Sequence, residues 1–187
     1  MRIISGIYKG KKLLEPIDKK TRPLKDLDKE SIFNLLLHSN YINLSLKDSF
    51  VLDLFAGSGS FGLECLSRNS SHVTFVENYE PAIHTLKKNI RNLNILNKYS
   101  LKEEDIFNNR FINRLNKKFD LIFADPPYKE ERIFNLLSIV YENKILKKNG
   151  IFVIHRNKKS DELSNNKFEI IEIRIYGISK IIFYKLK

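Results

Sequence analysis

The fold of this chain follows from the stretch Val51-Leu52-Asp53-Leu54-Phe55-Ala56-Gly57-Ser58-Gly59-Ser60-Phe61-Gly62, in which an apolar strand runs through a glycine-rich turn into a helix. Gly57 and Gly59 allow positive φ and let the backbone approach a ligand closely, while Asp53 ends the strand at the same crevice. The spacing also satisfies the dinucleotide-binding fingerprint, with an acidic residue, Glu77, about 20 residues beyond it. The stretch therefore predicts a cofactor-binding turn without identifying the cofactor.

Asp53 distinguishes the two candidate cofactors. A nicotinamide cofactor places its pyrophosphate at the helix N-terminus, where a neighbouring carboxylate would repel it. The same carboxylate suits the cationic amino-acid end of S-adenosylmethionine. Glu77 follows the apolar run 72–76 and could accept the ribose hydroxyls of either cofactor. We therefore expect S-adenosylmethionine, and the alternatives are a nicotinamide cofactor or a purely structural turn.

Strand-like and helix-like segments alternate along the chain. We expect strands at 50–54, 73–77, 99–102, 119–124 and 151–155, and helices at 60–67, 81–92, 108–115 and 131–141. This alternation predicts an α/β fold with a Rossmann-like, mostly parallel, doubly wound sheet and right-handed crossovers. The expected additions are a C-terminal antiparallel hairpin at 168–175 and 180–184, and an N-terminal extension with short strands at 2–5 and 11–14 and a helix from Asp26 to near Ser39-Asn40.

Four carboxylates fall at or just beyond the ends of successive expected strands: Asp53, Glu77, Asp105 and Asp125. The carboxyl ends of parallel strands meet at one edge of a sheet, and this edge is where such folds bind ligands. Four carboxylates there suit a cation that carries several hydroxyl and amine donors. We therefore expect the cofactor crevice at this edge.

A second motif, Asp125-Pro126-Pro127-Tyr128, follows the apolar run 119–124. Its prolines fix φ and remove two N–H donors, which leaves a rigid loop whose carbonyls can face the crevice. A nucleobase amine is a poor nucleophile, but the Asp125 carboxylate and the Pro126 carbonyl can bind its hydrogens and aim its lone pair at a sulfonium methyl group. Tyr128 could stack on an extruded base. The loop therefore predicts amine methylation, and a simple Asp-Pro turn is the alternative.

Length and composition predict one globular domain spanning 1–187. Of its residues, 42% are hydrophobic, and no apolar stretch approaches the roughly 20 residues that a membrane span needs. The N-terminus lacks the apolar core of a signal peptide, and a lone cysteine, Cys65, fits a reducing compartment. We therefore expect a cytoplasmic protein that is a monomer and has no membrane partner.

The charge distribution points to nucleic acid. The formal net charge is +11, and residues 1–25 hold eight basic and two acidic side chains, which gives that segment a net charge of +6. A basic arm that neutralises phosphates gains affinity by counterion release. We expect this segment to bind RNA, and the alternative is a solvated lysine-rich surface.

Further segments of the N-terminal region, taken with these two motifs, resemble the RsmD family. They are Arg2-Ile3-Ile4-Ser5-Gly6, Gly10-Lys11-Lys12-Leu13, Arg22-Pro23 and Glu30-Ser31-Ile32-Phe33-Asn34-Leu35-Leu36. The resemblance covers almost the whole chain, although Leu24 and Leu27 stand where the family usually has Thr and Arg. It implies a class I methyltransferase that uses S-adenosylmethionine to methylate N2 of one guanine in 16S ribosomal RNA, on the RNA itself or within an assembling 30S particle.

The resemblance also implies roles for individual residues. The methionine and turn side of the cofactor pocket would be formed by Asp53, Phe55, Gly57, Ser58 and Gly59, the ribose would be bound by Glu77, and the adenine by Asp105 and Ile106, with Glu103 and Glu104 as alternatives. The guanine would be oriented by Asp125, Pro126 and Tyr128, and RNA would meet Arg22 and the basic hairpin with Lys9, Lys11 and Lys12. Residues 1–40 would form the RNA-binding extension and 41–187 the catalytic core.

Rival functions each leave a feature unexplained. A DNA adenine-N6 methyltransferase shares the loop chemistry but normally carries a recognition insert, for which 187 residues leave little room. A nicotinamide oxidoreductase leaves Asp53 and the proline loop unexplained, and a non-catalytic RNA-binding module leaves both motifs unexplained. A carbon-5 pyrimidine methyltransferase needs a cysteine beside the base, where Cys65 is misplaced. The four histidines, which we expect on the surface or packed, lack metal-ligand spacing, and we expect no metal: His38, His72, His84 and His155.

Overall fold

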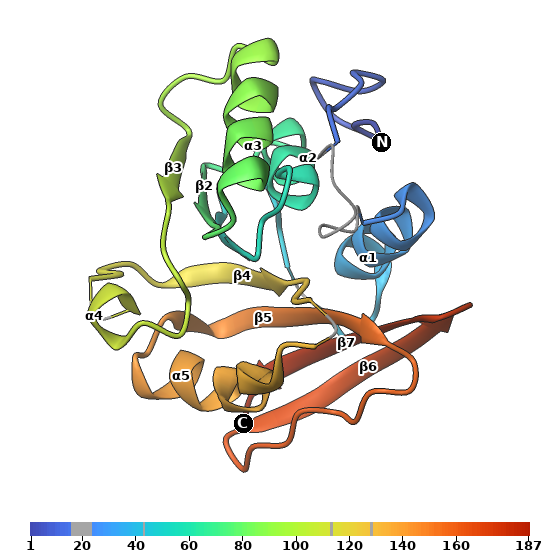
Figure 1. Ribbon diagram of the computed structural model, residues 1–187. Helices are drawn as coiled ribbons and strands as arrows, with labels where there is room; N and C mark the ends of the chain where they lie inside the picture. Colours follow the sequence, from blue (N-terminus) through green and yellow to red (C-terminus); the bar gives the residue numbers. More distant parts are fainter. Residues whose placement is uncertain (16–23, 43, 113, 128) are drawn as a thin grey trace.

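A mixed sheet of seven strands forms the centre of the computed structural model, which describes residues 1–15, 24–42, 44–112, 114–127 and 129–187 (Figure 1). The strand order is β3-β2-β1-β4-β5-β7-β6. The pairs from β3 to β5 are parallel, and β7 is antiparallel to both β5 and β6. The bounds are β1 Phe50–Leu54, β2 His72–Val76, β3 Tyr99–Lys102, β4 Phe119–Ala124, β5 Leu146–Asn157, β6 Phe168–Tyr176 and β7 Ser179–Leu186. The predicted Rossmann-like sheet with a C-terminal antiparallel hairpin is confirmed.

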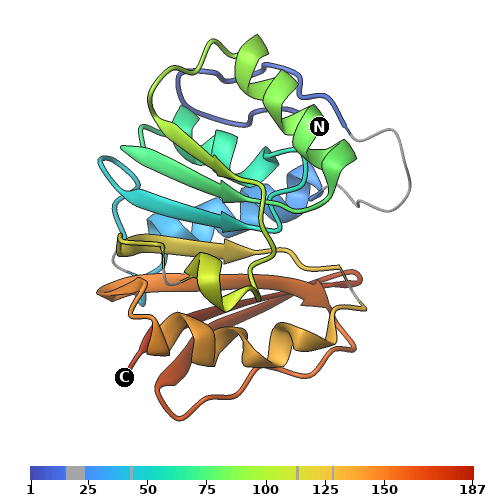
Figure 2. The ribbon, with the colours of Figure 1, turned by 60° about the vertical axis from the view of Figure 1, so that its left-hand side comes forward.

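Helices cover both faces of the sheet. Apolar side chains of α1 (Asp26–His38), α2 (Ser60–Ser67) and α3 (Glu80–Asn92) share one core with the sheet residues of one face. Those of α4 (Asn109–Ile112), α5 (Leu136–Glu142) and the preceding 3-10 helix η1 (Glu131–Asn135) share a second core with the other face. Figure 2 shows α4 and α5 in front of the strands, with α1 and α2 behind them. Both faces are therefore buried, as a parallel sheet requires.

The two N-terminal strands expected at 2–5 and 11–14 do not form. The segment turns back on itself, with Ile3 N donating to Lys11 O at 2.9 Å, but only an isolated Arg2–Lys12 bridge forms. The neighbouring amides donate instead to α2, from Ile4 and Ser5 to the Glu64 carboxylate and from Ile7 to Ser67 O. Backbone donors used in this way are not available to a strand ladder.

Three expected elements differ from the structure by more than a shift of one or two residues at an end. β5 begins at Leu146 and not at Ile151, because Leu146 pairs with Phe119 and a register shift before Leu121 takes up the intervening residues. The helix expected at 108–115 is the single turn α4, after which the bonds from Arg114 N and Leu115 N span three residues, as in a 3-10 turn. The helix expected at 131–141 begins as η1 before it becomes α5.

Across the part of the chain that the structure describes, no helix is both long and apolar enough to cross a membrane.

Candidate cofactor and amine-binding site

The predicted site residues meet at the carboxyl edge of the sheet because three strands end in register. Leu54, the last residue of β1, pairs with Val76 of β2 and with Ala124 of β4. The residues that follow these strands are therefore neighbours, and they carry the glycine turn, Glu77 and Asp125. The glycine turn therefore lies between Glu77, which follows β2, and the Asp-Pro-Pro loop, which follows β4.

The glycine turn has the backbone conformation that its sequence predicts. Gly57 and Gly59 have φ of 56° and 83°, and Phe55 also has a positive φ, 56°. A bulky residue in that region is strained, and such strain concentrates at functional sites. A Cβ on Gly59 would lie 2.3 Å from Leu86 Cδ1, so Gly59 also permits close packing of the turn against α3.

Glu77 holds the turn in place through its carboxylate. Oε2 accepts from Gly57 N at 2.7 Å, and Oε1 accepts from Asn78 N and Tyr79 N at 2.9 Å each. These bonds join the end of β2 to the turn after β1. Glu77 is buried at this junction, beside the glycine whose backbone is open to a ligand.

Asp53 lies beneath the turn, on the core side. Its side chain is 1% exposed, and Oδ2 accepts from Gly62 N in the first turns of α2 at 2.9 Å. Burial raises the pKa of Asp53 well above its usual range, the Gly62 amide opposes this shift, and the carboxylates of Asp125 and Glu77 add to it. The carboxylates predicted at the ends of β1, β2 and β4 are therefore close enough to interact.

The raised pKa of Asp53 predicts a pH-dependent stability. The folded protein holds this proton more tightly than the unfolded chain, so this group lowers the free energy of unfolding as pH rises from about 3.9, the ordinary value, toward the raised one. Asp53→Asn removes the titration. We expect the stability of the variant relative to the wild type to improve across that interval in denaturant titrations at a series of pH values. A difference that is constant with pH would contradict this assignment.

Ser58 and Ile106, both predicted to line the cofactor pocket, also make contacts within the protein. The Ser58 carbonyl accepts from Asn89 Nδ2 at 3.0 Å, and Ser58 Oγ lies 4.0 Å from Met1 Sδ. Ile106 is packed in the core between the sheet and α5. Both positions therefore support the walls of the site through backbone and core contacts.

Asp105 forms a bridge to the loop that follows β4. Oδ1 accepts from Phe107 N at 2.9 Å, and Oδ2 accepts from Arg132 Nη1 at 2.7 Å. Arg132 also binds both carboxylate oxygens of Glu130 and lies 4.5 Å from the centroid of the Phe107 ring. The bonds from Arg132 lower the pKa of Glu130. Sequence reasoning missed Arg132, because this contact depends on how the loop after β3 meets η1.

The alternatives to Asp105 have partners elsewhere. Glu103 pairs with Lys87 at 2.5 Å, and Glu104 pairs with Arg114 at 2.9 Å. Of these three acids, Asp105 is therefore the one that pairs with Arg132, in the 3-10 helix after the β4 loop.

The Asp-Pro-Pro loop places Asp125 beside a buried histidine. Asp125 Oδ1 lies 2.8 Å from His155 Nδ1, and its side chain is 21% exposed. Pro126 is buried and Pro127 is exposed, while Tyr128 lies outside the described residues. The expectation that His155 is on the surface or packed misses this contact. The signal that could have found it is the one that identified Asp53, a polar residue near the carboxyl end of an apolar strand.

The N-terminal segment packs beside the site. Lys29 of α1 is buried and donates to Arg2 O at 2.7 Å and to Ser60 Oγ, at the start of α2, at 3.1 Å. Burial lowers the pKa of Lys29, against the opposing effects of Glu64 and Asp26. Lys9, Lys11 and Lys12 are exposed on this segment, and Arg22 lies outside the described residues.

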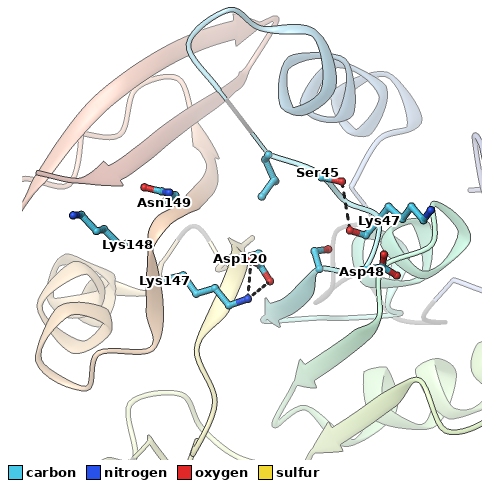
Figure 3. Close-up of a pocket in the computed structure, with 9 residues that line it drawn as sticks. Ser45, Lys47, Asp48, Asp120, Lys147, Lys148 and Asn149 are labelled. Carbon is cyan, nitrogen blue, oxygen red and sulfur yellow. Dashed lines mark hydrogen bonds and ion pairs between the residues drawn. The ribbon is translucent and has the colours of Figure 1, made fainter.

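A separate pocket of about 440 Å³ opens at the opposite edge of the sheet (Figure 3). It is lined by Ser49, which precedes β1, and by Asp120 near the start of β4. Lys147 Nζ lies 2.8 Å from both Asp120 carboxylate oxygens and closes one side. The strands separate this pocket from the carboxyl edge, so it is not part of the candidate site.

Known proteins resemble this chain in sequence and in fold. The chain is 32% identical to ribosomal RNA small subunit methyltransferase D of Haemophilus influenzae over 190 residues, which cover 99% of this chain and 93% of that protein. The solved structure of the Escherichia coli protein yhhF is similar with a TM-score of 0.82 at 23% identity, covering 100% of this chain and 98% of that one. The structure of SMU.776, a complex with SAH, has a TM-score of 0.68 at 17% identity and covers 86% of this chain and 50% of that one.

The family described as Conserved hypothetical protein 95 matches residues 1–185, nearly the whole chain. Its match includes both motifs, the basic N-terminal segment and the C-terminal hairpin. The chain therefore belongs to this family, the RsmD family of methyltransferases.

Proposed function

We propose that the protein transfers the methyl group of S-adenosylmethionine to the exocyclic N2 of a guanine in small-subunit (16S) ribosomal RNA. One observation supports this proposal most. The glycine turn, which Glu77 holds, and Asp125 both follow strands that end in register, so they lie at the same edge of the sheet. One edge thus holds both a turn suited to the cofactor and a carboxylate suited to an amine. The family relationship supports an RNA substrate.

The acidic residues around the turn fit S-adenosylmethionine. Burial is the main cause of the raised pKa of Asp53, and the carboxylates of Asp125 and Glu77 add to it; a bound cation would relieve this added repulsion. The cofactor supplies an electrophilic methyl group on a positively charged sulfur. Glu77 would accept its ribose hydroxyls, Phe55 and the open backbone at Gly57 would lie on its methionine and turn side, and Asp105 would hold its adenine amine.

Asp125 and Pro126 orient the target amine. The Asp125 carboxylate accepts an N–H of the amine, which favours a tetrahedral nitrogen and directs its lone pair at the methyl group. As the nitrogen–carbon bond forms, the bond from sulfur to the methyl group breaks, and positive charge moves from the sulfur to the nitrogen, where the fixed carboxylate stabilises it. S-adenosylhomocysteine is the leaving group, and the methylated nitrogen loses one proton to water. Stacking of the extruded base on Tyr128 and a carbonyl contact from Pro126 complete the proposed capture.

The basic N-terminal segment extends the site toward RNA phosphates. Lys9, Lys11 and Lys12 are exposed, and the segment that carries them is tied through Arg2 and Lys29 to the start of α2. Residues 1–40 thus act as the RNA-binding extension and residues 41–187 as the catalytic core. The protein works as a cytoplasmic monomer on RNA or on an assembling 30S particle, and Arg22 adds a further phosphate contact.

Glu77→Ala should weaken cofactor binding about 10- to 100-fold, since it removes the ribose acceptor and frees the Gly57 amide from the turn. Calorimetry with S-adenosylmethionine measures the change. Glu80→Ala is the matched control, because Glu80 is an exposed carboxylate three residues further on and should leave affinity unchanged. Equal affinities in the two variants would contradict the role of Glu77.

The substrate class can be tested with a labelled methyl group on the cofactor. We expect label to enter small-subunit ribosomal RNA, as free RNA or in particles from cells that lack this modification. Duplex DNA should remain unlabelled. Label in DNA adenine would favour the adenine-N6 alternative, and tight binding of NAD without methyl transfer would favour an oxidoreductase.

A further inference from the structure

His155 is held against Asp125 by the pairing of two strands. Ala124 of β4 pairs with Ile154 of β5, so Asp125 and His155 are the next residues of two adjacent parallel strands. The His155 side chain is 1% exposed, and its Nδ1 lies 2.8 Å from Asp125 Oδ1. A fully buried polar side chain thus contacts the carboxylate that we assign to the target amine.

The direction of this bond follows from the partner. An ionised carboxylate can only accept, so Nδ1 must carry the hydrogen and donate it to Oδ1. Oδ1 is then occupied, and Oδ2 is the oxygen left to accept from the amine. His155 therefore distinguishes the two carboxylate oxygens and fixes the plane of the group.

The other side of the ring faces a second carboxylate at a longer distance. Nε2 lies 3.8 Å from Asp28 Oδ2 and has no hydrogen-bond partner among the described residues. Asp28 is itself 3% exposed and accepts a bond from Ser179 Oγ at 2.8 Å. The ring thus lies between α1, which carries Asp28, and the loop after β4, with β7 holding Asp28 in place.

We propose that His155 is a positioning residue, which orients the Asp125 carboxylate for the amine. The proposal rests on the proposed role of Asp125. An aspartate on a loop can rotate about both side-chain torsions, and a misplacement of about 1 Å can reduce a rate about 100-fold.

Two amide substitutions separate positioning from packing. In His155→Asn the amide nitrogen can stand where Nδ1 stands, and in His155→Gln it reaches the position of Nε2. Single-turnover methylation at saturating cofactor and RNA should stay within about threefold of wild type for Asn and fall about 10- to 100-fold for Gln and Ala. Cofactor affinity should change little in all three variants. If thermal melting shows that His155→Ala does not fold, the comparison of the His155→Asn and His155→Gln rates still tests the positioning role.

A double variant tests whether His155 acts through Asp125. In an Asp125→Ala background, His155→Ala should cause no further loss, because the group that it orients is gone. The proposal would be overturned if His155→Ala reduced the rate by the same factor in both backgrounds. It would also be overturned if His155→Asn and His155→Gln had equal rates, or if His155→Ala had the wild-type rate. If Asp125→Ala itself has the wild-type rate, the proposed function of the loop fails instead, whatever His155 shows.

Discussion

Asp125→Ala should lower the single-turnover rate of methyl transfer about 10²- to 10³-fold, the scale for loss of one preorganised electrostatic contact. The carboxylate gains its importance as charge develops on the amine nitrogen, so cofactor affinity should change far less than the rate. Asp125 is partly exposed just after β4, but its removal leaves the buried His155 Nδ1 without its partner, so thermal melting checks that the variant folds. The measurement is single-turnover methylation of small-subunit particles, paired with calorimetry of cofactor binding.

Asp125→Asn is the informative companion to this variant. It keeps the size of the side chain and an acceptor oxygen but removes the charge. We expect a rate between those of wild type and Asp125→Ala. Asp161→Ala, which removes an exposed carboxylate from the loop after β5, is the control and should have the wild-type rate. Wild-type rates in both Asp125 variants would show that the loop does not act on the amine.

Neutralising Lys9, Lys11 and Lys12 together by Gln should weaken RNA binding about 100-fold at about 0.15 M salt, and should reduce the slope of log affinity against log salt by about 2 to 3. Each lysine is exposed on the segment that packs along α2. Each is expected to neutralise one phosphate, so the loss should be similar for RNAs of different sequence. Binding of labelled RNA at several salt concentrations measures both quantities.

A matched control separates a local contact from net charge. Lys47, Lys118 and Lys148 are equally exposed but lie near the opposite edge of the sheet. Their replacement by Gln lowers the net charge by the same amount. It should leave the salt slope nearly unchanged. Equal effects of the two triple variants would assign the N-terminal charge to general attraction and not to a defined RNA contact.

The strands and turn of the site could be predicted because their signals are local. The apolar run 50–54, the glycines of the turn and the run 119–124 each specify an element from neighbouring residues alone, and β1, β4 and α2 have the predicted bounds. The placement of Glu77 and Asp125 beside the turn then follows from the common edge of parallel strands.

The contacts missed by sequence reasoning depend on residues far apart in the chain. His155 meets Asp125 only because β5 is the neighbour of β4, and it meets Asp28 only because α1 covers that end of the sheet. The bond from Arg132 to Asp105 likewise joins η1 to the loop after β3. The N-terminal segment fails to form the expected strands because Glu64, buried on α2, accepts its amides. Periodicity carries no information about such partners.

The identity of the methylated nucleoside tests the central claim most directly. Small-subunit particles from a strain that lacks this modification would be incubated with the purified protein and S-adenosylmethionine, and the RNA would be digested and analysed by mass spectrometry against nucleoside standards. The account predicts N2-methylguanosine at one site, formed by the wild type and strongly reduced with Asp125→Ala. Methylation of adenine N6 or of a pyrimidine carbon, or a product formed equally by both proteins, would contradict it.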